Sequence, residues 1–582
     1  SHQGLSLKRL VGYHWFGGEA IFGIPISVSV SFVFLFVLFG SMLDFAGAGR
    51  YFLDLALALV GKYRGGPAKA SILASGLTGM VSGSSIANVV TTGTFTIPIM
   101  KKTGFSAVKA GAIEVAASVN GQIMPPIMGA AAFIIAEMLG ITYFQVVTHA
   151  IIPAAVVYLS LFWISDLEAS KLGLKGMPPE YLPNLGKTFI SGIHFLLPIA
   201  LLIYLLIFKR WTAGTSVFYS IVFLMAIMII QKLKPSKIQT INQLFLQILD
   251  GLLDIINGMI RGAMNMVNVA IAIAAAGMIV GAVGSTGLSN AMIEVVEIIS
   301  GGNIVILLFM VMVLCLILGL GLPTTANYLV VAALMANVIV EIGGASGIVL
   351  PLIAVHLYVF YFGLMADVTP PVGLAAYAAS AISRADPIKT GVQAFYYEIR
   401  TAILPVVFIF NPEILLIGIR SFWHGLLVFF VSLVAILSFT SATQAWLLTR
   451  LKWFEILTLL FVTVCMFRPD FIMNFAYPEY EKIKKGLNEQ VLVEKGSIFR
   501  VHITRYTNYG ERYKLFAFPI NETEKLSVSD ITGLTLEKNE KGNFDVIDLE
   551  FMGLAEKKGI EFYDEVTALD MSSTERPAKE FI

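Results

Sequence analysis

Charged residues are scarce in this sequence of 582 residues. Asp, Glu, Lys and Arg together make up 14% of it, whereas hydrophobic residues make up 57% and the mean hydropathy is +0.80. A soluble domain has roughly 25% charged residues and about 45–50% apolar ones. This composition excludes a soluble globular enzyme, a disordered chain and a nucleic-acid-binding protein, and it predicts a polytopic membrane protein.

Cysteines are few, and the common catalytic motifs are absent. Cys315 and Cys465 each lie in an apolar run, so we interpret them as small hydrophobic residues rather than a disulfide or metal-binding pair. Residues 186–188 resemble the end of a P-loop, but Tyr181 stands where the motif requires glycine. HExxH, GxSxG and GxGxxG in a strand–helix context are also missing. The sequence therefore favours neither ATP-driven transport nor an enzyme, and we expect no catalytic residues.

The charges that are present divide the chain into two parts. Residues 477–582 carry 15 Lys/Arg and 20 Asp/Glu, and strand-like alternation appears only after about residue 490. We predict a soluble, β-rich C-terminal domain over 477–582. Upstream, runs of about 20 apolar residues predict spanning helices. They lie near 21–43, 143–165, 189–208, 213–230, 263–283, 346–364, 395–419, 422–440 and 445–467. Two segments of mixed polarity, 50–64 and 239–262, are compatible with interfacial amphipathic helices or with tilted spans.

One apolar stretch, 65–100, is broken in the middle by the small and polar residues of 79–88. Basic residues accumulate on the cytoplasmic side of membrane proteins. Both ends of this stretch are basic, which predicts a re-entrant hairpin with both ends on that side; two short complete spans would give the same flanks. The flanking residues are Lys62, Arg64 and Lys69 before it and Lys101, Lys102 and Lys109 after it.

A second apolar stretch, 303–341, is broken by residues 319–327. Its flanks carry Glu294, Glu297 and Glu341 and no Lys or Arg, which fits a hairpin that opens to the opposite side.

The two breaks resemble each other and form an internal repeat. Residues 85–89, SIANV, align with 324–328, TTANY, at an offset of 239. Downstream, NGQIMPP at 120–126 aligns with ADVTPP at 366–371 at an offset of 245. Opposite flanking charge implies an inverted repeat, which many secondary transporters have. We divide the chain into a lead-in (1–20), a first repeat (21–240), a second repeat (241–420), additional transmembrane helices (421–476) and the C-terminal domain.

The chemistry of the breaks suits a cation and an anion. Irregular backbone survives at membrane depth only inside protein or beside a wet cavity. Hydroxyl, amide and freed carbonyl oxygens form a neutral cage for Na⁺, while helix N-termini attract a carboxylate. Helix capping alone would also account for the Ser, Thr and Asn residues. The candidate Na⁺ ligands are Ser85, Asn88, Asn120, Gly121, Thr324, Asn327, Ala366, Asp367 and Thr369. The candidate substrate ligands are Ser84, Ser85, Thr91, Thr92, Pro125, Thr324, Thr325 and Pro370.

Asp367 is an acid inside a span, immediately before a helix break, and such residues are functional candidates. It can be a cation ligand, a proton relay, or half of a pair with an unseen base; Gln122 is its equivalent in the first repeat. Glu114 and Glu137 are weaker candidates of the same kind. We interpret His356 as a hydrogen-bonded packing residue, and the GxxxG spacings in 258–262 and 277–281 as sites of close helix packing.

Three motifs resemble signatures of a known family. Residues 83–98, GSSIANVVTTGTFTIP, look like the first hairpin signature of the large membrane subunit of tripartite ATP-independent periplasmic (TRAP) transporters. Residues 321–326, GLPTTA, and 367–371, DVTPP, are similar to its second-half signatures. The likeness covers about residues 15–410, and the nearest branch is the TAXI type, in which the small and large subunits are fused.

The resemblance implies an all-α polytopic fold of the ion-transporter superfamily with an elevator mechanism. It implies symport of an organic anion, usually a carboxylate, with Na⁺ or H⁺ through a bacterial inner membrane. The implied partners are a periplasmic TAXI-type binding protein and a small membrane subunit. That subunit normally precedes this region, and since the sequence begins at Ser1 we expect it to be missing here. The alternatives are a carboxylate symporter that needs no binding protein, an ion channel, and an intramembrane enzyme using Asp367 and Glu114.

The C-terminal domain carries a weaker resemblance. Residues 553–560 followed by 564–569 are similar to the helix–strand segment of PDZ-like domains, and also to an uncharacterised domain appended to some TAXI-type permeases. A small β-rich regulatory or docking module without catalysis is the alternative.

Overall fold

The protein is described here from a computed structural model. The described residues are 6–18, 20–129, 131–233, 240–286, 295–296, 298–301, 303–320, 322–345, 348, 350–468, 480–482, 491–493, 498–507, 510–520, 524–539, 543–550, 553–557 and 560–572. Glu294, Glu297 and Gly321, which entered the sequence-based predictions, lie outside them. The chain divides into two compact units. The first holds residues 1–287, 312–334 and 352–467, and the second holds 288–311, 335–351 and 468–582.

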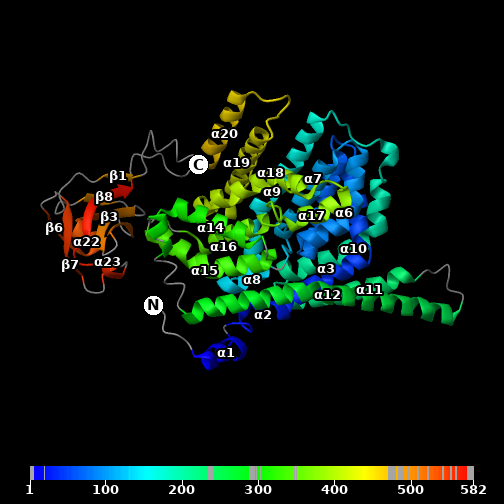
Figure 1. Cartoon of the computed structure of the whole chain (residues 1–582), viewed down its shortest axis with the longest axis horizontal. Helices are drawn as coiled ribbons and strands as arrows, with labels where there is room; N and C mark the ends of the chain where they lie inside the picture. Colours follow the sequence, from blue (N-terminus) through cyan, green and yellow to red (C-terminus); the bar gives the residue numbers. More distant parts are fainter. Residues whose placement is uncertain are drawn as a thin grey trace. The chain divides into compact units, whose positions relative to one another are not determined.

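The secondary-structure elements of the first unit, in its described residues, are helices (Figure 1). The helices of its first half are α1 (Leu7–Phe16), α2 (Ile24–Val28), α3 (Phe34–Phe45), α4 (Ala48–Val60), α5 (Gly66–Ser82), α6 (Ser85–Lys102), α7 (Ala107–Asn120), α8 (Ala131–Leu139), α9 (Tyr143–Lys171), α10 (Leu185–Ile203) and α11 (Ala213–Lys232). Short π- or 3-10 segments lie at η1 (Ser29–Val33), η2 (Gly121–Ile123), η3 (Pro179–Tyr181) and η4 (Tyr204–Phe208).

The second half follows with longer elements. They are α12 (Ile241–Thr286), α14 (Ile304–Leu318), α15 (Thr324–Ala345), α16 (Leu352–Met365), α17 (Leu374–Ser383), α18 (Pro387–Phe410), η6 (Pro412–Leu415), α19 (Phe422–Thr443) and α20 (Trp453–Phe467). The outer ends of α14 and α15 belong to the second unit.

Eight helical stretches among the described residues are long and apolar enough to cross a membrane, judged by length and composition. The predicted polytopic membrane protein is therefore confirmed. These stretches are Ile24–Phe45, Tyr143–Lys171, Pro179–Phe208, Ala213–Lys232, Ile241–Val283, Thr324–Gly344, Pro387–Phe410 and Phe422–Thr443.

Several helices differ from the prediction made from hydropathy. α16 (Leu352–Met365) and α20 (Trp453–Phe467) are shorter than the predicted spans 346–364 and 445–467, and neither is among the eight stretches long enough to cross a membrane.

The described residues of the two predicted segments 239–262 and 263–283 continue from Ile241 as one helix, α12, of 46 residues, because no proline interrupts the chain there. α18 covers 387–410 instead of 395–419. Its start is set by Asp386, which caps the helix ahead of a proline, and its end by Pro412, since a proline disfavours helical backbone in the residue before it. Hydropathy detects neither signal.

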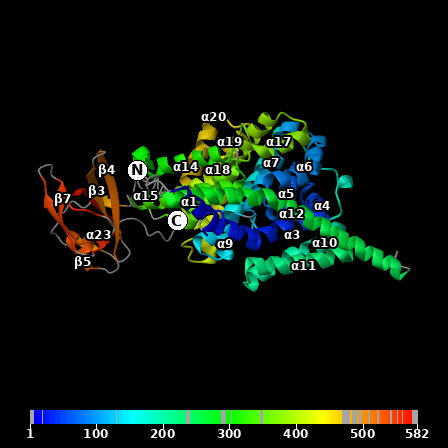
Figure 2. The same cartoon turned by 60° about the horizontal axis from the view of Figure 1, so that its bottom comes forward.

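α12 packs along α3 and α11, and it lies beside α11 in the views of Figures 1 and 2. Small residues permit this close approach. A Cβ atom on Gly262 would lie 3.0 Å from Leu38 Cα, and one on Gly277 would lie 2.7 Å from the Ala20 carbonyl oxygen. The interpretation of the GxxxG spacings as sites of close helix packing is confirmed.

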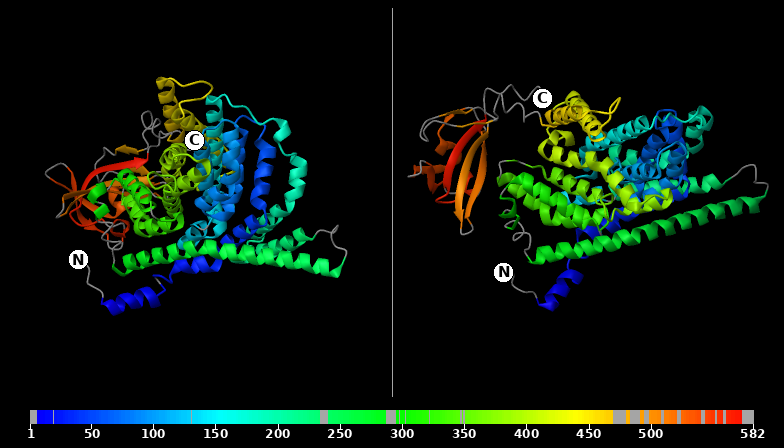
Figure 3. Two further views of the ribbon diagram at one scale, coloured as in Figure 1. Left: turned by 45° about the vertical axis from the view of Figure 1, so that its right-hand side comes forward. Right: turned by 45° about the horizontal axis from the view of Figure 1, so that its top comes forward.

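The C-terminal residues form an antiparallel sheet, drawn in orange to red in Figure 3. Its strand order is β4-β3-β8-β7-β6, and β1 also pairs with β8; β2 and β5 form a separate pair. The strands are β1 (Tyr480–Lys482), β2 (Val491–Val493), β3 (Ile498–Thr507), β4 (Gly510–Pro519), β5 (Glu524–Leu526), β6 (Leu534–Lys538), β7 (Phe544–Leu549) and β8 (Glu565–Ser572), with short helices α22 (Val528–Thr532) and α23 (Leu554–Lys557).

An apolar core on this sheet includes Phe499, Val501 and Val546. Arg505 is held by two bonds of 2.6 Å to the carboxylate oxygens of the buried Asp564, and this hydrogen bonding raises the pKa of the guanidinium. The predicted β-rich domain is confirmed, including a helix followed by a strand at α23 and β8. The likeness to PDZ-like domains stays a prediction, as do the domain boundaries.

Candidate substrate and cation site

The break in the first apolar stretch is a two-residue turn between α5 and α6. Gly83 ends α5 with a φ of +65°, a left-handed conformation that glycine adopts without a Cβ penalty. Ser84 then caps α6, because its hydroxyl oxygen accepts a hydrogen bond from the Ala87 backbone N–H. The turn thus places the N-terminus of α6 at the tip of a helical hairpin.

Asn88, one turn into α6, is fully buried and reaches back to α5. Its Nδ2 donates to the backbone carbonyl oxygen of Ser75 at 2.8 Å. Its Oδ1 is buried and has no hydrogen-bond partner among the described residues. A buried acceptor without a partner loses its hydration without compensation, so this atom is available to a ligand.

The second break repeats this arrangement. Asn327, in the first turn of α15, is fully buried and donates from Nδ2 to the backbone carbonyl oxygen of Cys315 on α14, at 2.9 Å. Its Oδ1 is likewise buried and unpartnered in the described part of the chain. The two asparagines that the repeat aligned therefore make the same contact and leave the same atom free.

Each asparagine is also enclosed by a close backbone approach. A Cβ on Gly79 would lie 2.6 Å from Asn88 Nδ2 and 2.8 Å from Gly121 Cα. On the other hairpin, a Cβ on Gly319 would lie 2.5 Å from Asn327 Nδ2 and would overlap Ala366. Each tip is thus packed tightly against the helix break downstream in its own repeat.

This packing gives a prediction for Gly79. Gly79→Ala has to displace Asn88 or Gly121, because real Cβ atoms do not approach other atoms so closely. We expect uptake to fall at least about tenfold, with a loss of roughly 1–3 kcal/mol of stability from overpacking. Gly186→Ala is the matched control, since its added Cβ would meet only Asn184 Oδ1 at 3.6 Å. Equal uptake by the two variants would contradict the prediction.

The two repeats exchange hydrogen bonds at their breaks. Ser85 Oγ, at the tip of the first hairpin, donates to the Asp367 carboxylate of the second repeat. Thr324 Oγ1, at the second tip, donates to Gln122 Oε1 of the first repeat at 2.8 Å. Because Ser85 aligns with Thr324 and Gln122 with Asp367, these two contacts are related by the repeat.

A cavity of about 690 Å³ lies at these tips. Asp44 and Asn265, from α3 and α12, also line it. Among the described residues, its lining includes two acids, Asp44 and Asp367, and no Lys, Arg or His. Of the predicted site residues it brings together Ser84, Ser85, Thr91, Thr324, Thr325 and Asp367.

Other predicted residues do not line this cavity. Asn120 Nδ2 donates to Glu398 Oε1 at 2.9 Å, Thr92 Oγ1 contacts Glu114, and Thr369 Oγ1 donates to the Met365 carbonyl oxygen at 2.7 Å. Gly121 and Ala366 pack behind the tips, and Pro125 and Pro370 are half-buried just beyond them. No bound ligand tests these roles, which stay predictions.

Sequence analysis did not single out Asp44, although an acid inside an apolar run is a detectable signal. It also gave no sign that α3 and α12 supply part of the cavity wall. His356 does not belong to the cavity lining; its Nδ1 lies 2.7 Å from the Tyr328 hydroxyl oxygen, which confirms the packing interpretation.

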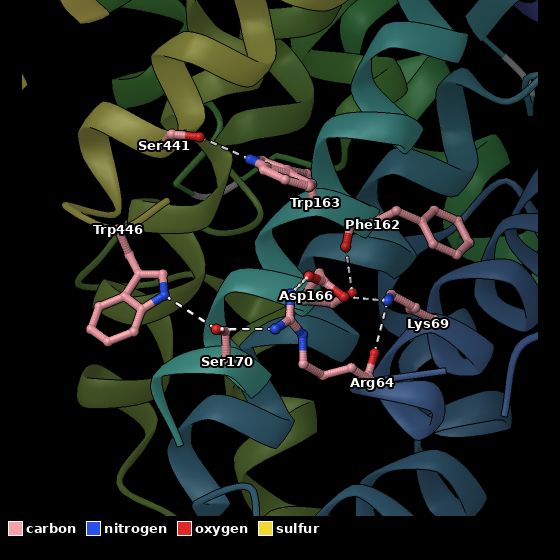
Figure 4. A network of polar contacts seen from close by, with 9 residues as sticks. Arg64, Lys69, Phe162, Trp163, Asp166, Ser170, Ser441 and Trp446 are labelled. Atoms are coloured by element: carbon pink, nitrogen blue, oxygen red, sulfur yellow. Dashed lines mark hydrogen bonds and ion pairs between the residues drawn. The ribbon is translucent and has the colours of Figure 1, made fainter. Parts of the chain in front are cut away.

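The two ends of the first hairpin lie at the same end of α9. Figure 4 shows Arg64 and Lys69 pointing toward Asp166 of α9, with Lys69 Nζ 2.6 Å from Asp166 Oδ1. Lys109, just beyond the other end of the hairpin, pairs with Glu168, two residues along the same helix. Arg64, Lys69 and Lys109 therefore lie near one end of α9. That the flanks share the cytoplasmic side and that the hairpin is re-entrant stay predictions.

These features define a multi-pass membrane protein with two broken-helix elements that meet at one cavity. Residues 3–423 match the family described as tripartite ATP-independent periplasmic transporter, DctM component, and the chain belongs to this family. Residues 425–582 match a domain of unknown function (DUF3394).

Individual relatives match over shorter segments. The uncharacterized protein YgiK of Salmonella typhimurium is 31% identical over 30% of this chain and 38% of its own length. The 2,3-diketo-L-gulonate TRAP transporter large permease protein YiaN of Escherichia coli is 24% identical over 30% of this chain and 41% of its own. The C4-dicarboxylate TRAP transporter large permease protein DctM of Vibrio cholerae is 35% identical over 16% of this chain and 20% of its own length. The matched segments thus span less than half of these relatives.

Proposed function

We propose that this chain is the permease of a secondary active transporter that imports a small organic anion, a carboxylate, by symport with Na⁺ or H⁺ through a bacterial inner membrane. The substrate would come from a periplasmic binding protein of the TAXI type, and a small membrane subunit would complete the complex. The names of two relatives, which refer to C4-dicarboxylate and 2,3-diketo-L-gulonate, support a carboxylate. The family match supports transport.

The observation that carries this proposal is the pair of free Oδ1 atoms on Asn88 and Asn327. Each is buried behind a hairpin tip and lacks a partner among the described residues, which suits a dehydrated cation with oxygen ligands. We assign one cation site to each tip. Both sites lie directly behind residues that line the cavity, so bound cations would sit close to the substrate.

The charge of the cavity lining supports coupling between substrate and cation. An organic anion in this cavity meets the acids Asp44 and Asp367, and the described part of the lining offers it no basic side chain. Its charge would be balanced by the first turns of α6 and α15, whose residues Ser85 and Thr324 line the cavity, and by the cations behind them. An anion that needs bound cations for its own binding is a substrate for symport.

The contacts across the repeats support the elevator mechanism as part of the proposal. Ser85 with Asp367, and Thr324 with Gln122, tie the two hairpin tips into one body that can carry substrate and cations together. The rival enzyme hypothesis pairs Asp367 with Glu114. It gains no support, because among the described residues Glu114 contacts hydroxyl groups and not Asp367.

Uptake by proteoliposomes tests the function. We expect labelled carboxylate to accumulate only when a cation gradient and the cognate binding protein are both present. Accumulation without the binding protein would favour the carboxylate symporter that needs none. Passive equilibration of ions, or hydrolysis without uptake, would refute the proposal. A panel of mono- and dicarboxylates in the same assay would identify the substrate.

A further inference from the structure

Glu114 is a fully buried acid that the proposed cation and substrate sites do not use. It lies on α7 and faces both arms of the first hairpin. Its carboxylate accepts hydrogen bonds from hydroxyl groups of α5, α6 and α7: Ser71, Ser75 (2.6 Å), Thr92, Thr96 (2.6 Å) and Ser118 (3.3 Å). A carboxylate at the centre of five hydroxyl groups is an unusual way to bury a charge.

No cation balances this carboxylate among the described residues. The basic groups on the elements that pack around α7 either have other partners or, like Lys102 of α6 and Lys389 of α18, are exposed. Lys69 pairs with Asp166, and Lys109 pairs with Glu168, both on α9. Lys101 donates to the Ser383 carbonyl oxygen at 2.8 Å. Arg400 pairs with Glu398 and donates to the Tyr397 carbonyl oxygen. A charge buried among helices without a countercharge is unfavourable even when it is hydrogen-bonded, and binding of a cation would neutralise it.

The space around Glu114 admits only the smallest cation. The hydroxyl oxygens of Ser75 and Thr96 already contact its two carboxylate oxygens directly, at 2.6 Å. A metal ion would have to separate these oxygen atoms, whereas a proton adds no volume. Hydroxyl groups also suit either state, because each can donate to the carboxylate or accept from the carboxylic acid.

The hydroxyl shell connects Glu114 to Asn88. Ser75 donates from Oγ to Glu114, while its backbone carbonyl oxygen accepts from Asn88 Nδ2. Thr92 Oγ1 contacts Glu114 and also lies 2.8 Å from the Asn88 carbonyl oxygen. Ser75 and Thr92 thus each contact both Glu114 and Asn88.

We propose that Glu114 is a proton-binding site inside the first hairpin, and that its protonation state sets the cation affinity at Asn88. One carboxylate oxygen takes a proton from water, the charge of the group changes from −1 to 0, and one hydroxyl of the shell turns from donor to acceptor. The link to Asn88 rests on the proposed function, whereas the proton site itself does not.

Infrared spectroscopy of the purified full chain tests the proton site without any transport. We expect a carboxylic acid C=O band that disappears as the pH is raised. The band should be absent from Glu114→Gln and retained in the control Glu137→Gln, since Glu137 is exposed on α8. A titrating band that persists in Glu114→Gln, or no band at any pH at which the protein stays folded, would overturn the proposal. Failure of the uptake assay alone would leave this result unchanged.

Stabilisation of the purified chain by Na⁺ tests the link to Asn88. A cation that binds only the folded state raises the thermal midpoint as its concentration rises. In the wild type we expect the Na⁺ concentration for half-maximal stabilisation to change at least tenfold across the pH range over which the infrared band titrates. In Glu114→Gln it should be independent of pH. The same pH dependence in both proteins would overturn the link.

A second substitution guards against misfolding of Glu114→Gln. Thr96→Val keeps the shape of the side chain but removes one hydroxyl from the carboxylate. Because one contact of the carboxylate is lost, the midpoint pH of the infrared band should differ from that of the wild type. Thr94→Val is the control, because the Thr94 hydroxyl donates to the Thr91 carbonyl oxygen and is exposed. An unchanged midpoint in Thr96→Val would overturn the assignment to Glu114.

Discussion

Replacing Asn88 by alanine should raise the Na⁺ concentration that half-saturates uptake by at least about tenfold, which corresponds to about 1.4 kcal/mol. The substitution removes the free Oδ1 atom and the bond from Nδ2 to the Ser75 carbonyl oxygen. Asn327→Ala should have an effect of similar size, because its amide makes the same contact with Cys315. We expect the apparent substrate affinity to fall with the cation affinity, since the cavity lining, as far as the structure describes it, has no basic side chain.

The measurement is uptake at fixed substrate over a series of Na⁺ concentrations, repeated as Na⁺-dependent thermal stabilisation of the purified protein. Asn184→Ala is the control, since Asn184 is an exposed cap of α10 that accepts from the Lys187 backbone N–H at 3.1 Å. Sodium curves in both variants that coincide with the control would remove the cation assignment. If neither wild type nor variants respond to Na⁺ while uptake follows the proton gradient, H⁺ is the coupling ion.

The helix breaks could be predicted because their signals are local. Gly83 followed by the capping residue Ser84 sets the first tip, and the sequence around Asn88 recurs around Asn327. Small residues at Gly79 and Gly319 were also visible in the sequence, but only the structure shows that each faces an asparagine amide. Local sequence signals thus predicted where the helices are interrupted. They did not predict which side chains the interruptions bring together.

Contacts between distant segments could not be predicted in this way. Asn120 has a side chain that can bind an ion. In the structure its amide nitrogen donates to Glu398, a residue 278 positions away in the sequence. Thr92, a predicted substrate ligand, contacts Glu114, a neighbour that the sequence did not indicate; its substrate role stays a prediction. The walls contributed by α3 and α12 depend on helix packing, which small residues such as Gly262 permit but do not specify.

Breaking the buried ion pair on α18 should produce the largest loss of stability. Arg400 is 2% exposed, and its Nη1 lies 3.3 Å from Glu398 Oε1 and 2.6 Å from the Tyr397 carbonyl oxygen. Arg400→Met leaves the fully buried carboxylate of Glu398 with Asn120 as its hydrogen-bond donor. Removing one partner of a buried pair destabilises a protein by about 3–5 kcal/mol, because the remaining charge is uncompensated.

The double variant Glu398→Gln/Arg400→Met separates this effect from lost packing. It buries no charge, and the glutamine carbonyl can still accept the hydrogen bond from Asn120, so we expect it to be more stable than Arg400→Met alone. Arg64→Met is the control: Arg64 pairs with Asp166, but its side chain is 47% exposed, and pairs of that kind contribute about 0–1 kcal/mol. Thermal unfolding of the four purified proteins is the measurement. If Arg400→Met is as mild as Arg64→Met, or if the double variant is no more stable than the single one, Glu398 does not carry an uncompensated charge. Its contact with Asn120 would then be an ordinary neutral hydrogen bond.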